Sequence, residues 1–166
     1  MYDFKPAEPL AAADLYRELL AAADALTAGE PDGVANMANV AALLWEFLPD
    51  LNWAGFYRVA PGKDGGGEEL VLGPFVGRPA CIRIPFGRGV CGTAAESRAT
   101  QLVVDVHAFP GHIACDAASA SELVVPVLRD GAVIAVLDLD SPRPGRFTED
   151  DAAGIEALAT LLAPRI

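Results

Sequence analysis

The sequence predicts an α+β protein in which an antiparallel sheet of about five or six strands carries helices packed on its faces. Three observations lead to this class. Apolar residues recur at helical spacing near both ends of the chain, two pairs of strand-like segments flank glycine-containing turns, and the chain has no internal repeat. Because a hairpin makes its two strands run antiparallel, we expect an antiparallel sheet. At 166 residues the chain fits a single domain over 1–166.

The chain opens with two predicted helices over about 10–48. The first, over 10–26, is rich in alanine and leucine and ends at the breaker sequence EPDG. The second, over 34–48, has apolar residues at helical spacing and ends before a proline. The residues expected to face the core are Leu15, Leu19 and Leu26 in the first helix and Val34, Met37, Val40, Ala41, Leu44 and Leu48 in the second.

The sheet and its loops are predicted over about 52–140. The first hairpin joins strands at 52–60 and 70–75 through the turn PGKDGGGEE, and the second joins 122–128 to 132–140 through a DG turn. Shorter elements lie between the hairpins: a strand at 81–85, a helix at 89–99 and a strand at 101–106.

A last helix is predicted over about 148–164. Thr148 can cap it, with Asp151 three residues later in place of the usual Glu or Gln of a capping box. The residues expected to face inward are Ile155, Leu158 and Leu162.

Composition limits the partners and the compartment. The net charge of −11 repels phosphate, so we expect neither nucleic acid nor anionic membranes as partners. Hydrophobic residues make up 52% of the chain, enough for a core, yet no apolar run approaches the roughly 20 residues that span a bilayer. The opening MYDFKPAEPL does not resemble a signal peptide. We therefore expect a cytoplasmic protein whose three cysteines rest as thiols.

The cysteines do not follow a structural metal pattern. Cys81, Cys91 and Cys115 form no C-x-x-C pair, and their odd number argues against a structural disulfide framework. His112 precedes Cys115 by three residues and His107 is near, but the paired spacing of a zinc site is missing. We expect no bound metal.

A reversible disulfide fits the cysteines better. Cys91 lies in GRGVCGTA, where a helix N-terminus favours the thiolate and glycines let two sulfurs approach. Free cysteines are more often small buried hydrophobic residues, and this alternative fits Cys81 or Cys91 taken alone. It fits Cys115 least, because GHIACDAASASE surrounds that cysteine with polar and small residues.

Three acidic residues are expected to meet at the open end of the second hairpin. Asp138 and Asp140, two residues apart in one strand, point to the same face of the sheet. Glu122 begins the partner strand, level with them when residues are counted outward from the DG turn. Clustered carboxyls raise one another's pKa, so one can hold a proton or bind an ammonium group. The alternative is an acidic strand end in solvent.

Aromatic residues of the first strand complete the candidate site. Trp53 and Tyr57 are four residues apart and share a strand face, whereas Phe56 takes the other face, where core packing explains it.

The segments NWAGFY, LVLGPFVGRPAC, IPFGRGVCGTA, DVHAFPGHIACDAASASE, VLDLDSP and RFTEDD together resemble the free methionine-(R)-sulfoxide reductases, which are GAF-domain enzymes. The resemblance extends from about residue 34 to the final helix and implies a GAF-like sheet. Two departures are a longer hairpin tip and Ala120 at a position that is commonly polar.

The resemblance also implies roles for the candidate residues. It makes Cys115 the nucleophile, Cys81 the resolving cysteine and Cys91 the third or alternative resolving cysteine. The substrate-binding residues that it implies are Trp53, Tyr57, Glu122, Asp138 and Asp140.

The implied reaction reduces free L-methionine-(R)-S-oxide to L-methionine. The cysteine nucleophile passes through a sulfenic acid and an intramolecular disulfide, with no bound cofactor, and thioredoxin or another dithiol restores the thiols. The R stereospecificity and a homodimer follow from the resemblance alone. The other interpretation is a non-catalytic GAF sensor of a small molecule or of redox state.

Overall fold

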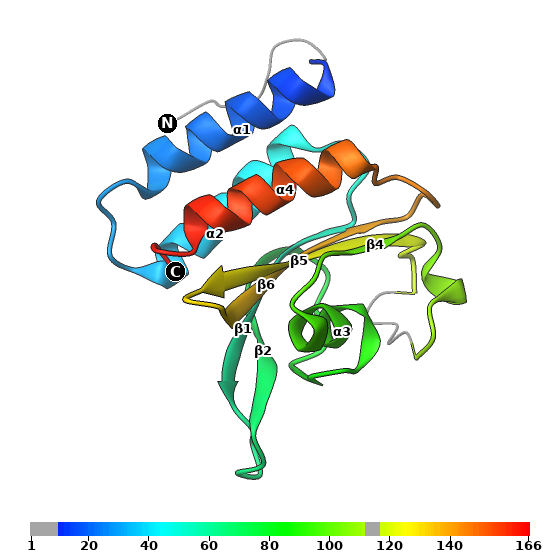
Figure 1. Cartoon of the computed structure of the whole chain (residues 1–166). Coiled ribbons are helices and arrows are strands. Elements are labelled where there is room, and N and C mark those ends of the chain that lie inside the picture. Colours follow the sequence, from blue (N-terminus) through cyan, green and yellow to red (C-terminus); the bar gives the residue numbers. More distant parts are fainter. Residues whose placement is uncertain (1–9, 112–116) are drawn as a thin grey trace.

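A computed structural model of the chain describes residues 10–111 and 117–166 (Figure 1). The described residues form six strands in one antiparallel sheet, in the order β3-β2-β1-β6-β5-β4. The strands are β1 (Trp53–Pro61), β2 (Glu68–Gly77), β3 (Arg83–Pro85), β4 (Gln101–Val103), β5 (Ser121–Arg129) and β6 (Ala132–Ser141). The helices are α1 (Ala12–Thr27), α2 (Gly33–Phe47), α3 (Gly89–Ser97) and α4 (Glu149–Leu162), with a short 3-10 helix, η1 (Val106–Ala108).

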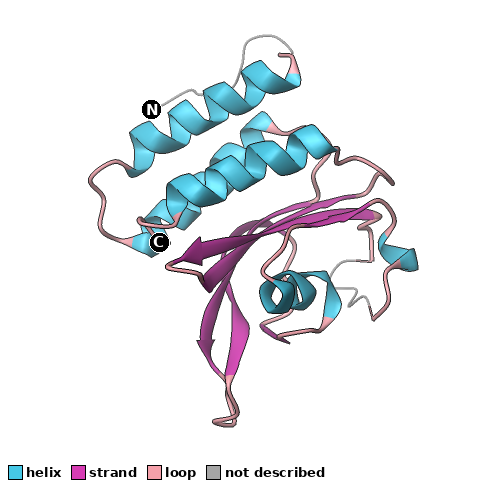
Figure 2. Cartoon of the chain, in the orientation of Figure 1, coloured by secondary structure: helices cyan, strands magenta, loops and turns pink. Residues whose placement is uncertain are grey.

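The sheet separates two apolar clusters. Helices α2 and α4 lie on one face of the sheet, and α1 packs on the outer side of these two helices (Figures 1 and 2). The strand residues in this cluster include Phe56, Leu123, Leu137 and Leu139. Helix α3 covers the other face and packs against the alternate residues of the same strands. The predicted α+β class, with an antiparallel sheet between helices, is confirmed.

Helix ends follow the local sequence. The Asp32 side chain caps α2 by accepting hydrogen bonds from the N–H groups of Val34 and Ala35. Thr148 and Asp151 form the predicted capping box at the start of α4. The three predicted core residues of α4, Ile155, Leu158 and Leu162, are fully buried. The prediction that Val34 faces the core is wrong, because this residue lies in the first turn of α2, at the edge of the packed face, and is 52% exposed.

Both predicted hairpins are present. Asp130 and Gly131 have φ values of 52° and 78°, the left-handed conformation that a tight DG turn requires. Each hairpin contains a shift of register, between Gly55 and Tyr57 in the first and between Val127 and Leu128 in the second. These two β-bulges decide which side chains reach the site.

The strand predicted over 101–106 is shorter in the structure. β4 ends at Val103, and the Asp105 side chain accepts a hydrogen bond from the His107 N–H at 2.9 Å, which turns the chain into η1. The helices within the described residues are each too short or too polar to cross a membrane.

Candidate active site

The acidic residues lie in rows that run across three adjacent strands. Glu122 of β5 pairs with Asp140 of β6, which in turn pairs with Trp53 of β1. In the next row, Asp138 pairs with Gly55. Directly opposed residues of antiparallel strands share a face. The prediction that Glu122, Asp138 and Asp140 meet at the open end of the second hairpin is therefore confirmed, and all three lie on the face that α3 covers.

The bulge in the second hairpin places Glu122 on this face. Near the turn, Leu128 pairs with Val133, and regular counting from there would set Glu122 opposite Leu139. One extra residue in β6 shifts the pairing, so Glu122 lies opposite Asp140 instead. Without the bulge, Glu122 would face the helices α1, α2 and α4.

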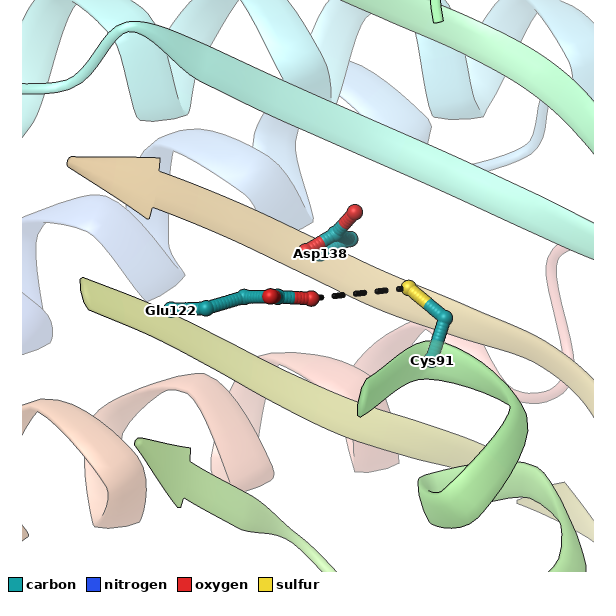
Figure 3. A group of neighbouring side chains, drawn as sticks. All are labelled: Cys91, Glu122 and Asp138. Atoms are coloured by element: carbon teal, nitrogen blue, oxygen red, sulfur yellow. Dashed lines mark hydrogen bonds between the residues drawn. The ribbon is translucent and has the colours of Figure 1, made fainter. Parts of the chain in front are cut away.

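Helix α3 brings a thiol to the acids. Its first turn places Cys91 over β5 and β6, where the Cys91 Sγ donates a hydrogen bond to Glu122 Oε1 at 3.9 Å (Figure 3). Cys91, Glu122 and Asp138 each offer one ligand atom, and these atoms lie within 4.8 Å of one another. Their exposed fractions are only 4%, 7% and 5%. The alternative of an acidic strand end in solvent is thus wrong for Glu122 and Asp138.

Burial and mutual repulsion favour the protonated forms of these groups. Burial raises the pKa of Glu122 well above its usual range, and the charges of Asp138 and Asp140 raise it further. The pKa of Asp138 is raised in the same way, first by burial and then by Asp140. The pKa of the Cys91 thiol is raised by burial and by the charges of Asp138 and Glu122. The expectation that the helix N-terminus favours the Cys91 thiolate is wrong, because the surrounding carboxyls and the dry interior dominate.

A small pocket with a cavity volume of about 10 Å³ opens beside the acids. Asp138 and Asp140 line one part of it, and Trp53 and Tyr57 form an aromatic wall. Asp138 Oδ1 is buried and has no hydrogen-bond partner within 10–111 and 117–166. The pocket lining consists of Trp53, Tyr57, Arg78, Pro79, Ala80, Asp138 and Asp140.

The aromatic residues of β1 lie on the predicted faces of the sheet. Trp53 and Tyr57 stack with ring centroids 5.8 Å apart, and Phe56 packs on the opposite face of the sheet, as expected. Phe75 extends the stack at 5.2 Å from Trp53, and the Trp53 Nε1 donates to the Arg78 carbonyl at 3.2 Å. The Trp53 ring is therefore held by stacking on Tyr57 and Phe75 and by its hydrogen bond to Arg78.

Phe75 and Arg78 were missed by the sequence reasoning. Regular alternation along β2 would turn Phe75 away from Leu72, but the bulge at Gly73-Pro74 turns both residues to the same face. Proline inside a strand is a signal of a bulge, so this placement was readable from GPF. No comparable signal marks Arg78.

Of the three predicted cysteines, the structure describes Cys81 and Cys91. Cys81 is half-buried, packs against the same cluster and takes part in a disulfide, whereas Cys91 is a free thiol. Cys115 lies outside the described residues, as does His112 of the weighed metal alternative. His107 is exposed in η1.

The segment that leads into β5 is held beside the acids. Asn52 Nδ2 donates to the Ser119 hydroxyl at 3.0 Å, and the Ala120 N–H donates to the Ser141 carbonyl at 2.7 Å. The chain is thereby fixed two residues before Glu122. Taken together, the site offers proton-holding carboxyls, an oxygen free to accept from a cation, a buried thiol and an aromatic wall.

Comparison with known proteins agrees with this architecture. The family described as GAF domain matches residues 36–166. The chain is 51% identical to free methionine-R-sulfoxide reductase of Escherichia coli over 150 residues, which cover 90% of this chain and 85% of that protein. It is 40% identical to the enzyme of that name from Saccharomyces cerevisiae, with 90% and 84% covered.

A solved structure shows the same fold. The free methionine-R-sulfoxide reductase from Neisseria meningitidis, in complex with its substrate, superposes with a TM-score of 0.89 at 47% identity, covering 97% of this chain and 93% of that one. The fold and the matched residues thus define a GAF-domain protein. Within that class, the chain belongs to the family of the free methionine-R-sulfoxide reductases.

Proposed function

We propose that the protein reduces free L-methionine-(R)-S-oxide to L-methionine. The observation that carries this proposal is the buried set of Glu122 and Asp138 beside a small aromatic pocket. Relatives at 51% and 40% identity that bear the name free methionine-R-sulfoxide reductase support it, as does the similar Neisseria meningitidis enzyme with its substrate bound. The R configuration rests on these relatives.

The acids would select the free amino acid. In the proposed complex, Asp138 and Asp140 accept hydrogen bonds from the α-ammonium group, which a methionine inside a peptide lacks. The buried Asp138 Oδ1, with no hydrogen-bond partner in the described part of the chain, supports this role. Trp53 and Tyr57 would hold the thioether portion, since sulfur packs favourably on aromatic rings.

Cys115 is the proposed nucleophile. Its thiolate attacks the sulfoxide sulfur, a protonated carboxyl supplies the proton that the departing oxygen needs, and methionine leaves while Cys115 becomes a sulfenic acid. The raised pKa values of Glu122 and Asp138 support these residues as proton donors near neutral pH.

Cys81 is the proposed resolving thiol. It condenses with the Cys115 sulfenic acid to give a disulfide and water, and a dithiol such as thioredoxin then reduces that disulfide by exchange. The disulfide state of Cys81 and the free, buried thiol of Cys91 support this order. Cys91 remains the third or alternative resolving cysteine.

The rest of the proposal concerns the setting of the enzyme. It acts as a single domain over 1–166, as a homodimer in the cytoplasm, under oxidative stress, and needs no bound cofactor. The apolar face of α1 is compatible with a dimer contact as well as with core packing.

One assay separates the enzyme from a non-catalytic GAF sensor. Reduced protein is incubated with free methionine-(R)-sulfoxide and a dithiol, and methionine is quantified. We expect methionine to be released, with one dithiol oxidised for each methionine formed. Binding of the sulfoxide without release of methionine would identify a sensor and overturn the proposed function.

A further inference from the structure

We propose that Cys91, Glu122 and Asp138 form a binding site for a borderline divalent metal ion, with Zn²⁺ as the best match, and that the bound ion blocks the site. The claim that the bound ion blocks the site rests on the proposed function. The claim that these residues bind an ion concerns the reduced protein alone.

The distances fit a metal ion. Zinc bonds of about 2.3 Å to sulfur and 2.0–2.2 Å to oxygen place tetrahedral ligand atoms roughly 3.4–3.6 Å apart. Cys91 Sγ and Glu122 Oε1 are 3.9 Å apart, and all three ligand atoms lie within 4.8 Å of one another. The Cys91–Glu122 pair would close by a few tenths of an ångström, and the widest pair by up to about 1 Å, to complete the geometry.

A second observation points to a cation. Asp138 is 5% exposed, and its Oδ1 has no hydrogen-bond partner in the described residues. A buried carboxylate oxygen without a donor is costly, and a bound cation supplies the missing interaction. Figure 3 shows Glu122 and Cys91 pointing toward each other, with Asp138 beside them.

The elements that hold these ligands are regular. Cys91 lies on α3, Glu122 on β5 and Asp138 on the neighbouring β6. Ligands on packed helices and strands keep their geometry better than ligands on loops. Three protein ligands leave a fourth position open for water or for another ligand.

The donor set selects the kind of ion. The ion displaces the protons that these groups hold in the metal-free protein, and they leave to solvent. One thiolate and two carboxylates then suit Zn²⁺ and similar borderline ions, whereas Mg²⁺ and Ca²⁺ prefer oxygen ligands alone. The ion would occupy the carboxyls that the proposed mechanism needs for the proton and for the substrate's ammonium group. Zinc should therefore inhibit reduction of the sulfoxide in competition with substrate.

The binding experiment uses metal-free protein reduced with a phosphine, because dithiols bind zinc. Co²⁺ serves as a spectroscopic probe, since a cobalt–thiolate bond gives a charge-transfer band that Zn²⁺ abolishes by displacement. Isothermal titration with Zn²⁺ gives the affinity. We expect one ion per chain and a cobalt–thiolate band.

Variants locate the ion. Cys91→Ser should abolish the band, whereas Cys81→Ser and Cys115→Ser should keep it. Asp138→Asn and Glu122→Gln should keep the band but weaken Zn²⁺ binding by about tenfold or more, in the range seen when metal-site partners are lost. The matched control is Glu68→Gln, an exposed acid on β2, which should leave the affinity unchanged. If Cys91→Ser fails to fold, as judged by near-ultraviolet circular dichroism, the two carboxyl variants decide.

The site is overturned if the protein binds no ion, if the band survives in Cys91→Ser, or if neither carboxyl variant weakens binding. A separate single-turnover assay of phosphine-reduced protein, without dithiol and with or without Zn²⁺, tests the blocking effect. Turnover that bound zinc leaves unchanged overturns the block while the proposed function stands. Zinc binding by a protein that never releases methionine overturns the function while the metal site stands.

Discussion

Replacing Asp138 by asparagine should stabilise the protein at alkaline pH and at the same time reduce its activity. The side chain is 5% exposed, and its pKa is raised by burial and then by Asp140. The substitution keeps the shape of the side chain and removes the charge. The proposed mechanism needs that carboxyl, whereas folding at high pH is opposed by its ionisation.

The magnitude follows from proton linkage. A carboxyl whose pKa is higher in the folded than in the unfolded protein binds more protons in the folded state between the two values. The free energy of unfolding is therefore highest below the unfolded value near 4 and falls as pH rises toward the folded pKa, by at most about 1.4 kcal/mol per pH unit for one proton. Asp138→Asn removes one such titrating carboxyl, and so lowers by one the number of protons that the folded protein can bind in excess of the unfolded protein. It also removes a charge that raises the pKa of Glu122.

Urea unfolding of the reduced protein between about pH 5 and pH 8 measures this effect, with fluorescence of the buried Trp53 as the signal. We expect a shallower decline of stability with pH in Asp138→Asn than in the wild type, and a gain of on the order of 1 kcal/mol at pH 8. In turnover, kcat should fall by about 10²-fold, the usual contribution of a positioned proton donor.

Glu68→Gln, which removes an exposed charge, is the control and should follow the wild-type pH dependence. Equal slopes for Asp138→Asn and the wild type would refute the linkage argument. Wild-type kcat together with a shallower slope would mean that the carboxyl is buried without a role in the chemistry.

Four further predictions test the proposed chemistry and the packing. Cys115→Ser should abolish release of methionine in a single turnover of reduced protein, and substantial release would exclude this cysteine as the attacking group. Cys81→Ser should release about one equivalent yet recycle poorly with thioredoxin, whereas Cys91→Ser should be less harmful; peptide mapping that finds mainly a Cys91–Cys115 bond would reverse this order. Acetylation of the substrate amine should raise KM for the wild type, and an unchanged KM would argue against recognition of the ammonium group. Gly55→Ala, whose new Cβ would lie 2.4 Å from an atom of the neighbouring strand, should lower stability by about 1–3 kcal/mol, while Gly66→Ala, with open space around it, should not; equal Tm values would contradict the packing argument.

The aromatic and acidic pairs were predictable because period-2 alternation holds where two strands pair without a shift. β1 and β6 pair in continuous register from Trp53 opposite Asp140 to Arg58 opposite Ala135. The facing of Trp53 and Tyr57, and of Asp138 and Asp140, therefore follows from spacing alone.

Residues next to a bulge were harder to place. The extra residue in β6 that turns Glu122 toward Asp140 has no glycine or proline in its own strand to mark it, since that strand reads AVIAVLDLD, although Pro126 of the partner strand lies beside the shift. Counting from the turn places Glu122 at the right level but opposite Leu139, and therefore on the wrong face of the sheet. In β2, by contrast, Pro74 marks the bulge that turns Phe75 toward Trp53.

The chemistry of Cys91 was mispredicted because it depends on tertiary contacts. A glycine-rich entry to a helix favours a thiolate when the helix end is exposed, yet α3 lies over β5 and β6 and buries its first turn against two carboxyls. A thiol held there is a poor nucleophile, since only the thiolate attacks. The same burial that favours protons on Glu122 and Asp138 disfavours a thiolate on Cys91. A site that uses these acids as proton donors therefore needs a nucleophile from outside the cluster, which supports the assignment of that role to Cys115.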